Sequence, residues 1–251
     1  MTPRRQPGPY NVEDFDVRSV DRSEVLRYLG YSGQRMTPEL EDRIDEVVER
    51  CLQIARCRGV WRVFDVSGRE TRGDGTFVVR LDGTALELSG ESMREYLGES
   101  GDAATGAVAV GVMAVTVGMD VERELRRLSL TDPAAHVIFD AAGTTTVERA
   151  ADACEASLVA EAARRGLHTG YRFSPGYGDL PLTVQPVLLD ATDARRRLGI
   201  TLSPQLLMTP TKSVTAIVGM YEEPQAAGHE KGLCRDCACN DFCKLRPCRR
   251  H

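Results

Sequence analysis

The hydrophobic pattern of this chain changes its period repeatedly, and this feature constrains the fold more than any other. Residues 38–55 carry apolar side chains at helical spacing along one face. From Val60 onward the pattern instead gives short β-prone runs between Gly- and Asp-rich turns, and residues 107–117 form a nearly continuous apolar run typical of a buried strand. Helices and strands alternate without a regular strand-helix-strand repeat. We therefore expect an α+β fold, with mixed helices around a twisted, mainly antiparallel sheet.

The same reasoning places the other elements. Further helices are expected at residues 23–29, 92–97, 119–128, 133–165 and 182–198, and strands at 60–66, 76–81, 85–88 and 214–220. The helix that begins at residue 133 has a clear start, because Thr131-Asp132-Pro133 supplies capping side chains and a proline in the first turn.

Composition divides the chain into four expected parts. Residues 1–22 are rich in proline and arginine, and we expect them to be disordered or extended. Residues 23–104 form an N-terminal part of helices and a small sheet, and a small, polar stretch separates them from a core at residues 105–223. Residues 224–251 are a tail that contains five of the eight cysteines.

Charge and hydropathy exclude several classes of function. The formal net charge of −5 and the pI near 5.5 argue against a nucleic-acid-binding protein. The longest apolar run is too short to cross a bilayer, and we find no export signal, so we expect a cytoplasmic protein with reduced thiols and no membrane partner. No nucleophile-base pair and no paired-carboxylate site can be identified, so no catalytic residue is predicted.

Residues 172–181, which read Arg-Phe-Ser-Pro-Gly-Tyr-Gly-Asp-Leu-Pro, form the strongest candidate for a binding loop. Pro175 restricts the backbone, and the two glycines can leave backbone amides uncovered for a ligand. Arg172 would offer planar, charged donors to a carboxylate, and Tyr177 would offer a hydroxyl on a rigid ring. By pattern alone, however, a Pro-Gly turn with one arginine is also compatible with a simple turn.

This loop carries a resemblance to a known family. The motif Arg-x-x-Pro-Gly-Tyr at residues 172–177, with Pro181, is followed by Leu-Met-x-Pro-x-Lys-Ser-Val at residues 207–214. Together they resemble the activation (reactivation) domain of cobalamin-dependent methionine synthase, in its free-standing form with a cysteine-rich C-terminal tail. The resemblance covers roughly residues 23–248 and implies the same α+β fold.

The resemblance implies which residues contact S-adenosylmethionine. The expected contacts are Arg172, Ser174, Pro175, Gly176, Tyr177, Glu148 and Val218. Glu148 corresponds to the family's ligand-contacting glutamate after a gap of one residue. Val218 keeps only backbone contacts, because the aromatic residue that the family has nearby is absent here. Tyr177 corresponds to a tyrosine that faces the cobalamin of the catalytic module.

The implied function is a reactivation subunit that supports reductive remethylation of cob(II)alamin in a cobalamin-dependent methionine synthase, and thereby methionine biosynthesis. The cobalamin would lie on the partner, the catalytic subunit, and the electron would come from a donor such as flavodoxin or ferredoxin. The chain would then act as a subunit of a methyltransferase.

The cysteine-rich tail leaves an alternative open. Cys234, Cys237, Cys239, Cys243 and Cys248 lie within fifteen residues, among several arginines and lysines. Four thiolates could hold zinc tetrahedrally or carry an iron-sulfur cluster, although the spacing matches neither a standard zinc finger nor the common ferredoxin runs. The chain could therefore be a metal or iron-sulfur electron-transfer protein. An activator of another corrinoid methyltransferase is a further alternative.

Overall fold

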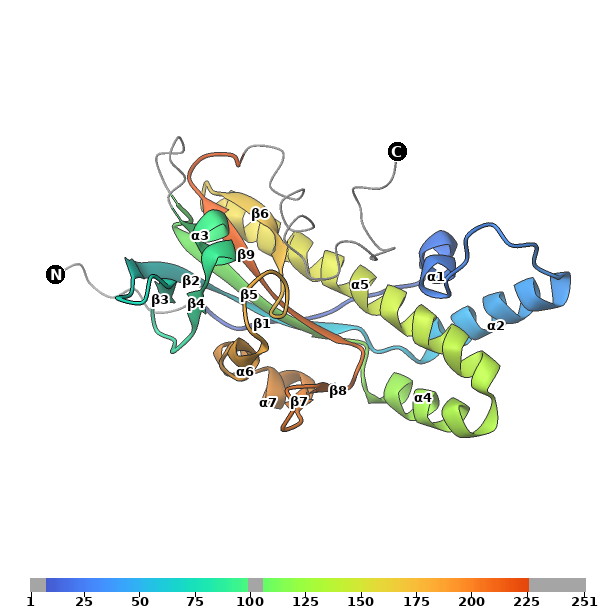
Figure 1. The fold of residues 1–251 in the computed structure, drawn as a ribbon. Helices are drawn as coiled ribbons and strands as arrows, with labels where there is room; N and C mark the ends of the chain where they lie inside the picture. The colour runs from blue at the N-terminus through green and yellow to red at the C-terminus, as the bar shows by residue number, and fades with distance from the viewer. Residues whose placement is uncertain (1–7, 99–105, 226–251) are drawn as a thin grey trace.

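The computed structural model describes residues 8–98 and 106–225, and its centre is one twisted antiparallel sheet (Figure 1). The strands follow the order β4-β3-β2-β5-β9-β6, and β1 pairs with β2 beside this path. They are β1 (Asn11–Asp14), β2 (Arg58–Thr71), β3 (Phe77–Leu81), β4 (Glu87–Ser89), β5 (Ala109–Thr116), β6 (His168–Phe173) and β9 (Ser213–Tyr221), while β7 (Thr201–Leu202) and β8 (Met208–Thr209) form a separate pair. The predicted α+β fold is confirmed.

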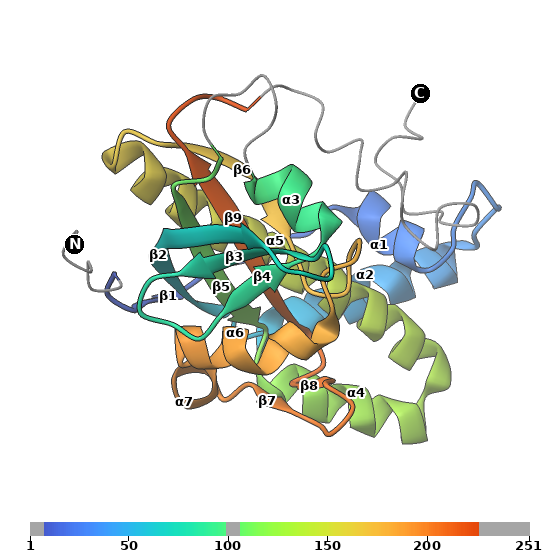
Figure 2. The same ribbon diagram turned by 60° about the vertical axis from the view of Figure 1, so that its left-hand side comes forward.

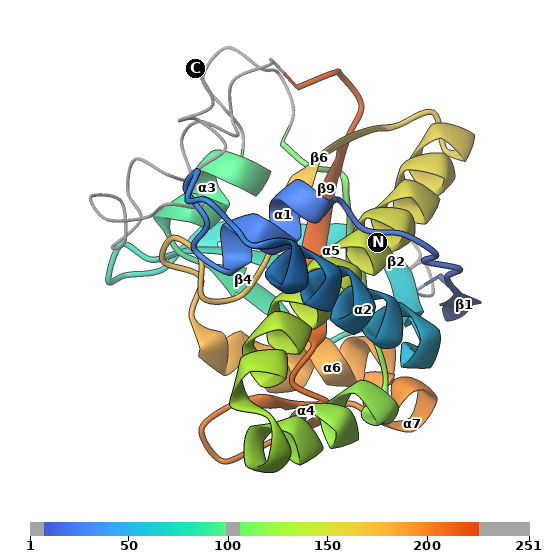
Figure 3. The same cartoon turned by 90° about the vertical axis from the view of Figure 1, so that its right-hand side faces the viewer.

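Helices cover both faces of this sheet. They are α1 (Arg22–Tyr28), α2 (Pro38–Ile54), α3 (Glu91–Leu97), α4 (Met119–Thr131), α5 (Pro133–Arg164), α6 (Gln185–Thr192) and α7 (Ala194–Leu198), with a short 3-10 turn, η1 (Leu182–Val184). Figure 3 shows α2 and α4 beside the long helix α5 on one face, whereas Figure 2 shows α6 and α7 beneath the sheet on the other.

Strand alternation explains the two layers of the core. Along β5, Met113 and Val115 pack with α5, whereas Val112 packs on the opposite face with α3 and the Arg172 loop. Because β5 is buried along its whole length, it reads as a continuous apolar run rather than as an alternating pattern.

Two local expectations needed correction or extension. The predicted helix 182–198 is interrupted, because Asp193 has a left-handed backbone (φ 53°) that ends α6 before α7 begins. Within the segment expected to be disordered or extended, β1 adds to the sheet, and the Trp61 indole N–H donates to Glu13 at 2.5 Å. Strands from both predicted parts, 23–104 and 105–223, belong to the one sheet, and the division into parts stays a prediction.

Candidate functional site

The fold brings Arg172 together with two other predicted site residues. Arg172 lies opposite Val218 in the antiparallel ladder between β6 and β9, and its side chain points toward α5. There the guanidinium donates to Glu148 at 2.9 Å, to Asp152 at 3.1 Å and to Glu155 at 3.0 Å. Only 17% of the Arg172 side chain is exposed. A single cation is thus shared by three carboxylates.

The acidic partners of Arg172 come from one face of α5. Positions 148, 152 and 155 are four and three residues apart, so their side chains lie along one side of the helix. The Lys212 ammonium contacts the Thr144 hydroxyl, one turn before Glu148, at 2.7 Å and the Asp140 carboxylate, two turns before it, at 2.8 Å. The polar stripe of α5 is therefore held against Arg172 of β6 and against Lys212, which directly precedes β9.

The Glu148 carboxyl has a perturbed pKa. Burial raises its pKa above the usual value; the Arg172 charge opposes the rise, and the Asp152 charge adds to it. The surroundings include Tyr28 of α1, whose own pKa is raised first by burial and then by the charge of Glu148. Among the described residues, Arg172 is the only cation that forms an ion pair with Glu148, so this carboxylate is suited to receive a cationic ligand group.

The loop after β6 is closed on itself. Phe173 and Pro175 are buried, and the Gly176 amide donates to the Leu180 carbonyl at 2.8 Å. The Tyr177 amide donates to the Ser174 carbonyl at 3.2 Å. We expected uncovered amides here, but these two amides are used inside the loop, because the turn brings each within reach of a carbonyl.

The tip of the loop is tied to a distant helix. Asp179 accepts hydrogen bonds from the backbone amides of Glu91, at 2.6 Å, and Ser92, at 3.0 Å, so it caps the start of α3. Burial alone would raise the pKa of Asp179, but the Ser92 hydroxyl and these amides hold it below its usual value. Sequence reasoning missed this residue, because its capping partners lie almost ninety positions earlier in the chain.

Tyr177 differs from the rest of the loop in its exposure. Its side chain is 60% exposed, although its neighbours Pro175 and Leu180 are buried. Leu182, which lies against Gly176, is also exposed. The structure thus presents an aromatic and an aliphatic side chain on the outer surface of the loop.

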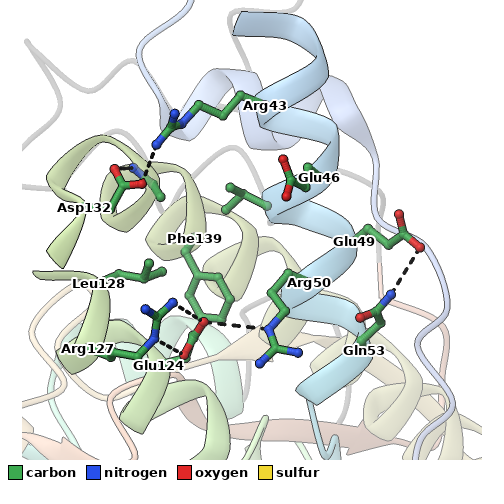
Figure 4. A pocket seen from close by; sticks show the side chains of 12 residues that line it. Arg43, Glu46, Glu49, Arg50, Gln53, Glu124, Arg127, Leu128, Asp132 and Phe139 are labelled. Atoms are coloured by element: carbon green, nitrogen blue, oxygen red, sulfur yellow. Dashed lines mark hydrogen bonds and ion pairs between the residues drawn. The ribbon is translucent and has the colours of Figure 1, made fainter. Parts of the chain in front are cut away.

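A surface cleft of about 620 Å³ lies elsewhere, between α2, α4 and α5 (Figure 4). Its basic side chains are already paired: Arg43 contacts Asp132, while Arg50 and Arg127 both contact Glu124. No predicted site residue lines this cleft. We therefore give it no part in the candidate site.

The described residues contain no group of three or more side chains placed to hold a metal ion. The predicted metal ligands Cys234, Cys237, Cys239, Cys243 and Cys248 lie outside the described residues. The three cysteines in the described part of the chain are free and buried, and burial raises the pKa of Cys51 to about 12 and that of Cys57 to about 11. These thiols stay protonated and unreactive at neutral pH.

Comparisons with known proteins support the fold. No family model and no curated protein matches the sequence. Among solved structures, the chain is similar to the crystal structure of the MetH reactivation domain bound to AdoHcy, with a TM-score of 0.61 and 14% sequence identity over 88% of this chain and 81% of that one. The expected resemblance to the methionine synthase reactivation domain is thereby confirmed at the level of the fold. No described helix is long and apolar enough to span a membrane.

Proposed function

We propose that this chain is an S-adenosylmethionine-binding reactivation subunit, which supports reductive remethylation of cob(II)alamin in a cobalamin-dependent methionine synthase in the cytoplasm. One observation carries the proposal. In a fold shared with a domain that was crystallised with AdoHcy, Arg172 and Glu148 lie in direct contact beside Val218 and the loop that follows β6. The sequence predicts all three residues as ligand contacts.

Binding would proceed as an exchange of ion pairs. The carboxylate of S-adenosylmethionine would compete with Asp152 and Glu155 for the Arg172 guanidinium, which can hold a carboxylate through two parallel hydrogen bonds. The ammonium and sulfonium of the ligand would then balance the carboxylates that it displaces and that of Glu148. Ser174, Pro175, Gly176 and the backbone of Val218 would contact the rest of the ligand.

The outer surface of the loop would face the partner. Exposed Tyr177 is the residue that we propose to contact the cobalamin-bearing catalytic subunit. The partner's cobalamin would supply the acceptor of the methyl group, and a donor such as flavodoxin or ferredoxin would supply the electron. The residues of this chain would hold and orient the methyl donor.

Calorimetric titration of the reduced protein tests the proposal. We expect saturable binding of S-adenosylmethionine and of S-adenosylhomocysteine, and no binding of adenosine, which lacks the amino-acid group that Arg172 would hold. Absence of binding by either amino-acid-bearing ligand would contradict the proposed function.

Replacement of Glu148 by glutamine should separate ligand binding from stability. We expect weaker binding of S-adenosylmethionine, because the neutral amide cannot balance a cationic group. The folded-state pKa of Glu148 is raised above its ordinary value of 4.5, so the protonated carboxyl contributes to the stability of the fold. This contribution is fully present below the unfolded-state pKa and is lost as the pH rises through the folded-state pKa.

Glutamine stays neutral at every pH, so the variant should gain stability relative to the wild type between acidic and neutral pH. The gain should be small, because 44% of the Glu148 side chain is exposed and water screens its charge. Urea unfolding at pH 4 to 7, beside calorimetric titration, measures both effects. Unchanged affinity would remove Glu148 from the site.

We also propose that the cysteine-rich tail binds zinc or an iron-sulfur cluster. Protein purified without oxygen should contain bound metal, and the double variant Cys237→Ser/Cys239→Ser should lose most of it. A brown protein whose absorbance bleaches on reduction would identify a cluster, whereas a colourless, zinc-containing protein would identify a structural site. Metal-free protein would contradict this proposal.

A further inference from the structure

A β-bulge lies in the ladder that carries Arg172. β6 and β9 pair Thr169 with Met220 and then Arg172 with Val218, so residues 170–171 of β6 stand opposite one residue of β9. Side chains alternate between the two faces of a regular strand, and residues three apart would point in opposite directions. The extra residue lets Thr169 and Arg172 share a face. The bulge thus decides that Arg172 points toward the carboxylates of α5.

The hydroxyl of Tyr96, on α3, sits at this bulge. It donates to the Tyr171 carbonyl of β6 and accepts from the Gly219 amide of β9 at 2.8 Å. A phenol can donate and accept at once, so it satisfies both backbone groups where the regular ladder is interrupted. Its ring lies where a side chain at residue 170 would begin: a Cβ on Gly170 would be 2.8 Å from it.

A second tyrosine fixes Tyr96 itself. The Tyr221 hydroxyl donates to the Tyr96 carbonyl, and a Cβ on Gly219 would lie 2.5 Å from that hydroxyl. Burial raises the pKa of both phenols above their usual values, so both remain neutral and keep their protons for donation. The carbonyl and the hydroxyl of Tyr96, near the C-terminal end of α3, are thus both hydrogen-bonded to β9.

The other end of α3 is joined to the candidate binding loop, residues 172–181. Asp179 caps the helix at Glu91 and Ser92, and Tyr96 lies on the turn that follows. Since α3 is only two turns long, it connects the bulge before Arg172 to the loop tip after it. A connection of this kind keeps a binding residue and its loop in one geometry.

We propose that Tyr96 is a positioning residue for the ligand site, and that its hydroxyl fixes the bulge from which Arg172 reaches α5. This proposal rests on the proposed function only for the ligand used to test it. The bulge, the two hydrogen bonds and the ion pairs of Arg172 are properties of the chain itself.

The test compares Tyr96→Phe, which removes only the hydroxyl, with Leu88→Ala, which shortens a buried side chain of the same hydrophobic cluster away from the bulge. Both should be destabilised, and urea unfolding measures by how much. At a temperature where each is folded, Tyr96→Phe should bind S-adenosylmethionine at least about tenfold more weakly, because small misplacements of binding groups are costly. Leu88→Ala should stay within about twofold of the wild type. Equal affinities of Tyr96→Phe and the wild type would overturn the proposal.

A measurement without ligand keeps the two hypotheses apart. In nitrogen-15 NMR spectra, Tyr96→Phe should speed hydrogen exchange at the Gly219 amide and shift the Arg172 guanidinium signals, whereas Leu88→Ala should leave both unchanged. If the wild type binds no ligand, the proposed function fails, and these signals still decide the role of Tyr96. If Tyr96→Phe does not fold, Gly170→Ala replaces it, since the added Cβ displaces the same ring. Unshifted Arg172 signals in the folded variant would overturn the proposal.

Discussion

Replacement of Arg172 by alanine is expected to weaken S-adenosylmethionine binding by about 1.5–3 kcal/mol, the range for hydrogen bonds to charged groups, or roughly 10- to 150-fold in Kd. The physical reason is that the ligand carboxylate would lose its planar donor pair and would instead face Glu148, Asp152 and Glu155. Calorimetric titration measures the loss. The affinity of Arg172→Lys should lie between those of the wild type and Arg172→Ala, because lysine keeps the charge but not the paired donors.

The matched control is Arg149→Ala, which removes an exposed arginine from α5 beside Glu148 without touching β6. It should bind the ligand as the wild type does. If Arg149→Ala and Arg172→Ala lose affinity equally, the effect would be one of net charge, and the carboxylate contact at Arg172 would be refuted.

Arg172→Ala should also change how stability depends on pH. Without the guanidinium, the three carboxylates of α5 repel one another when ionised. Because the Arg172 charge opposes the rise in the Glu148 pKa, its loss lets Glu148 take up a proton at higher pH, so the stability deficit relative to the wild type should shrink as the pH falls. Urea unfolding at several pH values measures this trend, and a deficit independent of pH would contradict the ion-pair account.

Gly90→Ala should disrupt the candidate binding loop, residues 172–181, although it replaces none of the predicted ligand contacts. Gly90 has a φ of +119°, and a Cβ there would lie 2.5 Å from the Asp179 carboxylate that caps α3. The substitution should cost about 1.5–5 kcal/mol, from backbone strain of about 1–3 kcal/mol in a conformation that is essentially restricted to glycine, and from loss of a cap worth about 0.5–2 kcal/mol. Because the cap also holds the loop tip, S-adenosylmethionine binding should weaken in the same variant.

Gly33→Ala is the control that separates the stability cost of backbone strain from the cost of losing the cap on α3. Gly33 has a similar φ of +96°, but a Cβ there would meet nothing within 4 Å. Urea unfolding should therefore show a smaller loss of stability, and titration should show wild-type affinity. If Gly90→Ala and Gly33→Ala lose equal stability and both keep wild-type affinity for S-adenosylmethionine, Asp179 does not hold the tip of the candidate binding loop in place.

Capping chemistry could be read directly from the sequence, because it acts within one helical turn. Thr37 and Asp132 each cap the helix that follows, and a proline occupies the first turn in both. The apolar run of β5 likewise revealed a buried strand, since burial on both faces leaves a continuous pattern. The candidate binding loop, residues 172–181, could be identified for the same reason, because its proline, glycines and arginine are neighbours in the chain.

Only the tertiary structure determined which side chains surround Arg172. Nothing near Arg172 in the sequence indicates that three carboxylates of α5 share its guanidinium, or that a register shift in β6 aims it there. The tyrosine at the bulge and the aspartate that caps α3 were also missed, because their partners lie 75 to 123 residues away. Propensity and capping arise from forces within a few residues, and so the sequence alone determined the capped helices, the buried strand and the position of the candidate loop. Contacts over such separations exist only once the sheet has set its register, and so only the fold decided which groups meet at Arg172.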